Sequence, residues 1–158
     1  MTQITVVCVG KLKEGYWRDA VAEYTKRLSA YCKVQIAELA EERLPQEPND
    51  AQIAAALEAE ADRMLPHLEG KTVYALCIEA KPQASEQFAA ALSAQVDAGQ
   101  KLAFVIGSSH GLSPRIKQLS QHKLSFSPMT FPHQLARVML FEQLYRAFSI
   151  MHKGKYHK

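Results

Sequence analysis

Short apolar runs alternate with segments of helical periodicity along this chain, and the alternation limits the possible folds more than any other feature. The apolar runs are rich in β-branched residues and have the length of strands. They cover residues 4–10, 33–39, 71–80, 101–107 and 123–127. Strands that alternate with helices form a mostly parallel sheet with helices on both faces. The sequence therefore predicts an α/β fold.

The helical segments carry signals at their ends. They cover residues 16–31, 51–65, 86–98, 114–119 and a last segment that extends to about Met151. Asn49 or Asp50 can cap the second helix, which we expect to stop before Pro66 because the residue before a proline avoids helical angles. Pro114 stands where a proline opens a helix. With 158 residues and no interdomain linker, residues 1–158 are predicted to form a single domain.

Composition excludes several classes of protein. No apolar run is long enough to cross a membrane, and the first residues lack the pattern of a signal peptide, so we expect a cytoplasmic protein without a membrane partner. The three cysteines form no C-x-x-C pair, which agrees with that compartment. The net charge of +3 permits a nucleic-acid partner without indicating one. The six histidines have no metal-ligand spacing, and we predict no metal site.

The segment after the fourth strand is a first candidate site, because ligands of parallel sheets bind at the carboxyl ends of strands. It reads G-S-S-H-G, and Gly107 and Gly111 would let the backbone approach a ligand closely. A tight turn between strand and helix explains the glycines equally well. The same letters satisfy G-x-S-x-G, the pattern of a hydrolase nucleophile, with Ser109 as that nucleophile.

A small serine hydrolase is therefore an alternative function, although the sequence provides poorly for the rest of a triad. The only acid after Ser109 is Glu142, which lies in the middle of the last helical segment, while His152 and His157 follow it. The chain also lacks the lid and loop segments of a hydrolase.

The loop "LSFSPMTFPHQ" is a second candidate site. No charge occurs from Leu124 to Phe131, and Pro128 and Pro132 restrict the backbone. Such a loop offers amide and carbonyl groups and apolar walls to a flat neutral group such as an adenine. A rigid connector, with Pro132 opening the last helix, is the plainer interpretation.

The last helical segment has apolar residues on more than one stripe, too many for one face of a small sheet. We therefore expect part of it to contact a second subunit. Arg137 and Arg146 stand among these apolar residues, and arginine suits interface ion pairs and anion recognition. Glu142 and Arg146 are four apart and can also form a simple helix pair. The basic tail that contains His157 is either functional or a frayed terminus.

Together these segments resemble a known family. "FVIG" with "GLS", then "LSFSPMTFPHQLARVMLFEQLYRAFSI", then a terminal "YHK" resemble the ribosomal RNA large-subunit methyltransferase H family, small enzymes of the SPOUT (trefoil-knot) class. The resemblance extends from "VVCVGKLKEGYW" to the terminus. In place of the family's usual residues the chain has Ser108 for a second glycine, His110 for a small or acidic residue, and Lys155 for a proline or alanine.

The resemblance implies a C-terminal trefoil knot, which periodicity alone does not reveal. It also implies S-adenosylmethionine as cofactor, and a homodimer that methylates N3 of a pseudouridine in 23S rRNA on the assembled ribosome. The family's cofactor contacts correspond here to Leu76, Gly107, Phe126, Ser127, Pro128, Met129, Thr130 and Phe131. All of them fall after the third, fourth and fifth strands.

The chemistry of such a methylation suggests roles for charged residues. N3 of pseudouridine carries an imide proton, so a cation would favour its anion and a neutral histidine could accept the proton. We expect Arg137 to stabilise the charge, and His157 with Tyr156 to act as base or to place the substrate. Lys11, Lys13 and Arg18 near the amino end, together with the basic tail, are candidates for phosphate contacts. A ribosome-associated module without catalysis remains a third interpretation.

Overall fold

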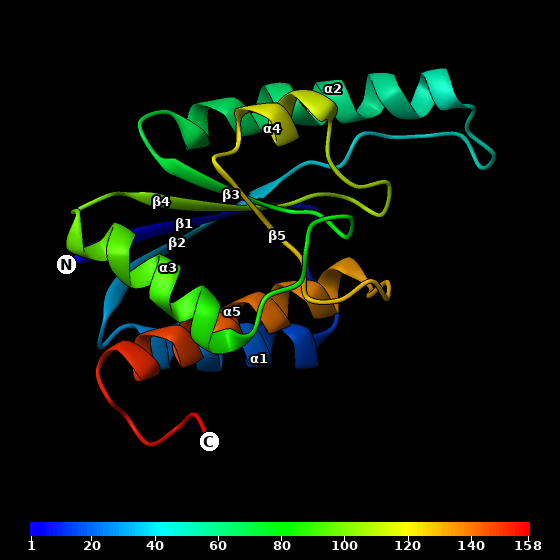
Figure 1. Ribbon diagram of the computed structural model, residues 1–158. Coiled ribbons are helices and arrows are strands. Elements are labelled where there is room, and N and C mark those ends of the chain that lie inside the picture. The colour runs from blue at the N-terminus through cyan, green and yellow to red at the C-terminus, as the bar shows by residue number, and fades with distance from the viewer.

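The computed structural model describes all 158 residues and has a five-stranded parallel sheet between two layers of helices (Figure 1). The strand order is β2-β1-β4-β3-β5, and every neighbouring pair is parallel. The elements are β1 (Thr2–Val9), α1 (Gly15–Leu28), β2 (Cys32–Leu39), α2 (Asp50–Leu68), β3 (Thr72–Leu76), α3 (Ser85–Asp97), β4 (Leu102–Ile106), α4 (Pro114–Leu119), β5 (His122–Leu124) and α5 (His133–Met151). The predicted α/β architecture is confirmed.

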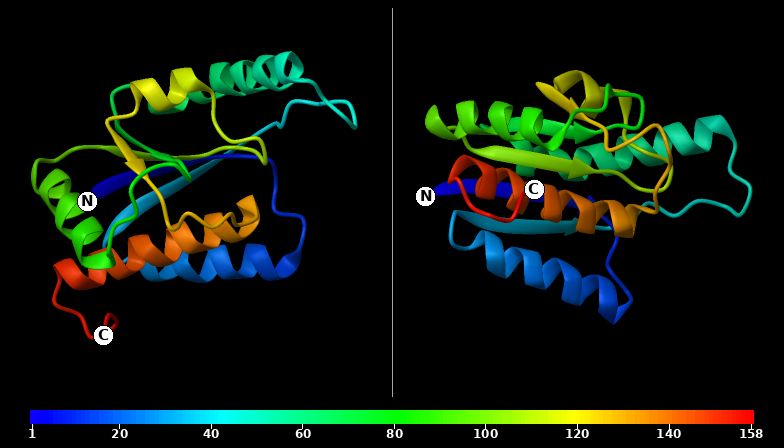
Figure 2. Two further views of the ribbon diagram at one scale, coloured as in Figure 1. Left: turned by 45° about the vertical axis from the view of Figure 1, so that its right-hand side comes forward. Right: turned by 60° about the horizontal axis from the view of Figure 1, so that its bottom comes forward.

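The helices divide unequally between the two faces of the sheet. α2 and α4 cover one face, while α1, α3 and α5 cover the other (Figure 1). α5 lies between α1 and α3, as Figure 2 shows from below. Strand residues alternate between two cores: Ile4, Val6 and Phe104 pack toward the α5 layer, and Val7 and Val105 toward α2. The central strand β4 is buried on both faces, which explains its continuous apolar sequence.

Several element boundaries differ from the prediction by up to four residues: α1 ends at Leu28 rather than at residue 31, and β5 ends at Leu124 rather than at residue 127. Two other differences have a clear cause. α2 continues through Pro66 to Leu68. Pro66 removes only the hydrogen bond to the carbonyl of Asp62, and both residues are exposed in the last turns, where water can replace that bond. β3 ends at Leu76 rather than continuing to residue 80, because its neighbour β5 ends at Leu124 in register with it.

The starts of α2 and α4 are formed by the residues that the sequence predicted for them. Asn49 caps α2: its side chain accepts from the N–H of Gln52 at 2.8 Å, and the Gln52 side chain accepts from the N–H of Asn49 at 2.9 Å. Pro114 opens α4 after the cap residue Ser113. None of the helices combines the length and apolar character that a bilayer crossing requires.

Candidate functional site

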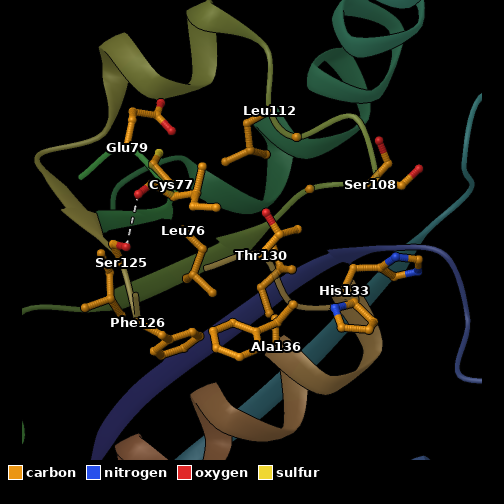
Figure 3. Close-up of a pocket in the computed structure, with 18 of the residues that line it drawn as sticks. Leu76, Cys77, Glu79, Ser108, Leu112, Ser125, Phe126, Thr130, His133 and Ala136 are labelled. Atoms are coloured by element: carbon orange, nitrogen blue, oxygen red, sulfur yellow. Dashed lines mark hydrogen bonds between the residues drawn. The ribbon is translucent and has the colours of Figure 1, made fainter. Parts of the chain in front are cut away.

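The carboxyl ends of β3, β4 and β5 surround a cavity of about 670 Å³ (Figure 3). Four segments supply most of its lining: residues 76–79, 106–112, 124–127 and 129–133. Seven of the eight residues expected to contact the cofactor line this cavity; Pro128 does not. Placement at strand ends thus brings together three segments that are far apart in the sequence.

The 107–111 turn forms one wall, and its close packing requires glycine. A Cβ on Gly107 would lie 2.1 Å from the carbonyl oxygen of Gly111, which is far inside van der Waals contact. Gly111 has a φ of +88°, a conformation that favours glycine. The N–H of Gly111 donates to the carbonyl of Ser108 at 2.9 Å and closes the turn. The turn therefore presents its backbone to the cavity.

The loop after β5 forms the opposite wall and is held by its own hydroxyl groups. The Ser125 hydroxyl lies 3.2 Å from the carbonyl oxygens of both Ile78 and Ser127, which attaches this loop to the segment after β3 (Figure 3). The Ser127 hydroxyl accepts from the N–H of Met129 at 3.0 Å. The Met129 side chain is 73% exposed, so at the tip of the loop it is free to cover a ligand.

Most of the cavity wall is neutral. Burial raises the pKa of the Cys77 thiol, which keeps it protonated. The exception is an ion pair at the rim, where Lys117 Nζ lies 2.6 Å from Glu79 Oε1. The hydrogen bond from Lys117 lowers the pKa of the Glu79 carboxyl. The two charges offset each other, so the site suits a ligand with a flat neutral portion.

Arg137 lies outside this lining. Its side chain is 2% exposed; Nη1 donates to Glu38 at 2.6 Å and Nη2 to the carbonyl of Gly10 at 3.1 Å. Arg137 therefore connects α5 to the carboxyl ends of β1 and β2. His133, one turn earlier, and Ala136, the preceding residue, do line the cavity.

Tyr156 and His157 lie near the other end of α5. The Tyr156 hydroxyl donates to Glu142 at 3.1 Å, and His157 Nε2 is 2.6 Å from Glu86. Burial, with the Glu142 carboxylate as a further cause, raises the pKa of Tyr156 to about 12. Arg146 Nη1 is 3.1 Å from His157 Nδ1; since arginine only donates, Nδ1 accepts and the ring proton is on Nε2.

The tail is thus distant from the chain's own large cavity. Ten residues of helix separate Ala136, on the cavity wall, from Arg146, which is about 15 Å along the axis. A second cavity of about 340 Å³ lies between α3 and α5 and has Leu124, Ser125 and Phe126 in common with the first. Glu142 lines this second cavity and also binds Tyr156 and Arg146. The smaller cavity therefore lies between the large cavity and the residues that hold Tyr156 and His157.

Ser109 lines the large cavity, and none of the side-chain hydrogen bonds joins it to a histidine or a carboxylate. The arrangement of a serine nucleophile with its base is therefore not present around it. Sequence reasoning did not single out the wall residues Cys77, Ile78, Leu112 and Ala136. The strand-end rule that located the site applies to most of them, but no motif marks them individually.

Comparison with known proteins identifies the family. The model of a family described as "Predicted SPOUT methyltransferase" matches residues 2–157. The chain is 47% identical over 158 residues to a protein of Exiguobacterium sibiricum and 50% identical over 157 residues to one of Bifidobacterium animalis subsp. lactis. Both relatives are named ribosomal RNA large subunit methyltransferase H, and the matches cover 98% or more of each chain.

Solved structures with low sequence identity share the fold. A probable methyltransferase from Bordetella pertussis has a TM-score of 0.59 at 16% identity, over 92% of this chain and 94% of that one. A methyltransferase from Legionella pneumophila, solved with bound SAM, has a TM-score of 0.53 at 13% identity, over 92% of this chain and 66% of that one. The resemblance read from the sequence is thereby confirmed: the chain belongs to the ribosomal RNA large subunit methyltransferase H family of SPOUT methyltransferases.

Proposed function

We propose that this protein transfers a methyl group from S-adenosylmethionine to N3 of a pseudouridine in large-subunit ribosomal RNA. The observation that carries the proposal is the neutral, main-chain-lined cavity at the ends of β3, β4 and β5, in a chain that matches named rRNA methyltransferases along its length. This substrate agrees with the names of the relatives.

The chemistry of the cavity fits the cofactor. Backbone groups of Leu76, Gly107 and the 126–131 loop would hold an adenine and its ribose, and the apolar side chains of Phe126 and Phe131 would exclude water. The cofactor, when bound, supplies an electrophilic methyl group on a sulfonium. The wall has one ion pair, at the rim, and no unpaired carboxylate. No free negative charge in the wall would therefore hold the sulfonium at a wrong position.

Arg137, Tyr156 and His157 are proposed to act on the nucleoside. The imide proton of N3 must leave before or during attack, and His157 can accept it at Nδ1 once Arg146 moves away. Tyr156 and His157 would have to leave Glu142 and Glu86 to reach a nucleoside beside the cavity. Arg137 would stabilise the anion only if the Glu38 contact rearranged, because its guanidinium is now buried.

The direct test is methyl transfer from labelled S-adenosylmethionine to 70S ribosomes that lack the modification, with the modified nucleoside mapped by mass spectrometry. We expect label at one pseudouridine of 23S rRNA. Removal of residues 156–158 should reduce the rate at least about hundredfold while the cofactor still binds. The variant Lys158→Ala, which keeps Tyr156 and His157, is the matched control. An unlabelled 23S rRNA with wild-type protein would refute the proposal.

We also propose a homodimer that binds the assembled ribosome. The half-exposed apolar residues of α5 support the dimer, and exposed Lys11 and Lys13 offer phosphate contacts. Arg18 has a different role. Its guanidinium donates to the carbonyls of Leu12 and Lys13, at 3.0 Å and 2.5 Å, and these bonds order the loop that carries the two lysines. Free 23S rRNA should bind more weakly than ribosomes do.

We further propose that residues 1–158 form a single domain with a C-terminal trefoil knot. The protein is proposed to be cytoplasmic and to need no metal. The Ser125 hydroxyl, after β5, lies 3.2 Å from the carbonyl of Ile78, after β3, and this contact between the two loops supports a threaded C-terminal part. Pulling the unfolded chain by its ends tests the knot. A knotted chain stays shorter than the roughly 3.6 Å per residue of an extended unknotted one.

A further inference from the structure

The wall of the large cavity contains one pair of opposite charges that the proposed function does not use. Glu79 and Lys117 are the only Asp, Glu, Lys or Arg residues of the lining. Lys117, on α4, places its Nζ 2.6 Å from Oε1 of Glu79, which follows β3. Their side chains are 31% and 54% exposed, so a ligand in the cavity can contact both.

Stability alone gives a weak reason for this pair. A partly exposed ion pair contributes little to stability, because water screens its charges and two long side chains lose freedom. α4 is also attached to α2 by Arg115, which pairs with Asp62 at 2.6 Å and with Glu58 at 3.0 Å. The position of the pair on the cavity wall therefore suggests a second role, which is contact with the ligand.

Both members of the pair have hydrogen-bonding capacity left. A lysine ammonium has three N–H donors, and Lys117 uses one of them on Glu79. A carboxylate has about four acceptor positions, and this bond occupies one of them. The same bond lowers the pKa of the Glu79 carboxyl, which therefore stays charged at neutral pH. A ligand can thus bond to both groups without separating them.

The proposed cofactor has a matching pair of charges. Its adenine is neutral and suits the apolar walls, whereas its amino-acid portion has a carboxylate and an ammonium group on the same carbon. At the pair each of these charges would meet its opposite, in an alternating arrangement of four charges. Figure 3 shows Glu79 at one end of the cavity and His133 at the other. The amino-acid portion would therefore lie at the Glu79 end.

We propose that Lys117 and Glu79 form the binding site for the amino-acid portion of the cofactor, with Lys117 on its carboxylate and Glu79 on its ammonium group. The inference rests on the proposed function, since it takes the cavity as the S-adenosylmethionine site. The pair makes the protein prefer ligands that carry the amino acid over adenosine thioethers that lack it. Neither residue takes part in the methyl transfer itself.

Calorimetry with two probes tests the inference without any measurement of activity. S-adenosylhomocysteine carries the amino-acid portion, and methylthioadenosine is an adenosine thioether without it. The wild-type protein should prefer S-adenosylhomocysteine at least about tenfold. Lys117→Met and Glu79→Gln should each weaken its binding about tenfold, because each removes a charge-assisted hydrogen bond. Binding of methylthioadenosine should stay within about threefold of wild type in both variants.

A third probe separates the two residues. Decarboxylated S-adenosylhomocysteine keeps the ammonium group and lacks the carboxylate. Its binding should be weakened by Glu79→Gln and should not be weakened by Lys117→Met. If Lys117→Met weakened the binding of this probe as strongly as that of S-adenosylhomocysteine, the contact assigned to Lys117 would be wrong.

Arg115→Gln is the matched control. It removes one positive charge from the same helix, and Arg115 does not line the cavity. The variant should have a lower melting temperature, because its ion pairs with α2 are lost, and unchanged affinity for both thioethers. An equal loss of affinity in Arg115→Gln and Lys117→Met would show a general effect of charge on α4 and would overturn the inference.

The outcomes distinguish the inference from the proposed function. If the wild-type protein bound neither S-adenosylhomocysteine nor methylthioadenosine, the proposed function would fail. If it bound both equally well, or if Lys117→Met weakened both alike, the role of the pair would be wrong and the function would stand. The same conclusion would follow if His110→Ala, which also changes the cavity lining, removed the preference and Lys117→Met did not.

Discussion

At the scale of single residues, Gly107 is the position where adding a single methyl group should have the largest effect on stability and on cofactor binding. In Gly107→Ala the new Cβ would meet the carbonyl of Gly111, and neither backbone atom can move without opening the turn. We expect a loss of about 1–3 kcal/mol in the free energy of unfolding. Binding of S-adenosylhomocysteine should be lost as well, which calorimetry would show.

Gly15→Ala is the control for that substitution. A Cβ there would meet only the end of the Arg18 side chain, at an ordinary 3.7 Å, and the position lies at the start of α1. Alanine should leave binding unchanged and stabilise the protein by up to about 1 kcal/mol. Equal damage at both positions would contradict the argument from the turn.

Glu60 should also make stability depend on pH. Burial raises the pKa of its carboxyl above the ordinary value of 4.5, with Glu41 adding to the rise and Arg63 opposing it. A raised acid contributes stability that is complete below 4.5 and is lost as pH rises through the folded-state pKa. Glu60→Gln does not ionise, so its stability relative to wild type should increase from pH 4 to pH 8. Urea unfolding at several pH values would measure this; a constant difference would contradict it.

At the scale of elements, the start of α2 shows how much a local signal contributes. Asn49 and Gln52 each accept a hydrogen bond from the other's backbone N–H. Asn49→Ala should cost about 1 kcal/mol of unfolding free energy in urea titrations. Cofactor affinity should not change, because neither Asn49 nor Gln52 lines the large cavity. A weaker affinity would contradict a purely local role for this cap.

Signals of this local kind explain which parts of the structure were predictable. Capping residues, apolar runs and helical periodicity are short-range, so the order of elements followed from the sequence. The strand order β2-β1-β4-β3-β5 depends on contacts between distant segments, which no short pattern encodes. Pro66 shows the reverse case, where a correct local rule was overridden because the last turns of α2 are exposed.

The residues of the site also divide into those that the sequence predicted and those that it did not. The strand-end rule and the resemblance located the 126–131 loop and Gly107, and all of these residues except Pro128 line the cavity. Cys77 and Ala136 also line the cavity, but they could not be found because no motif marks them. The catalytic roles of Arg137, Tyr156 and His157 stay predictions. Their present partners, Glu38, Glu142 and Glu86, hold them away from the large cavity.

At the scale of the whole molecule, the two layers differ in how well they are covered. The α5 layer buries Leu140, Phe141 and Leu144 completely against the sheet. On the same helix Val138 and Met139 remain partly exposed beside the smaller cavity. A single chain leaves this apolar surface in water, and a second copy would cover it at a symmetric interface.

If this surface forms a dimer, a single negative charge placed on it should weaken the association. The wild-type protein should sediment at twice the 17.7 kDa of the chain, and Met139→Glu should weaken self-association at least about thirtyfold, since it buries an unpaired carboxylate. Gln118→Glu adds the same charge on exposed α4, on the other face of the sheet, and should remain dimeric. Sedimentation equilibrium over a range of concentrations would measure both. A wild-type monomer, or a dimer unaffected by Met139→Glu, would place the interface elsewhere and leave the apolar surface of α5 unexplained.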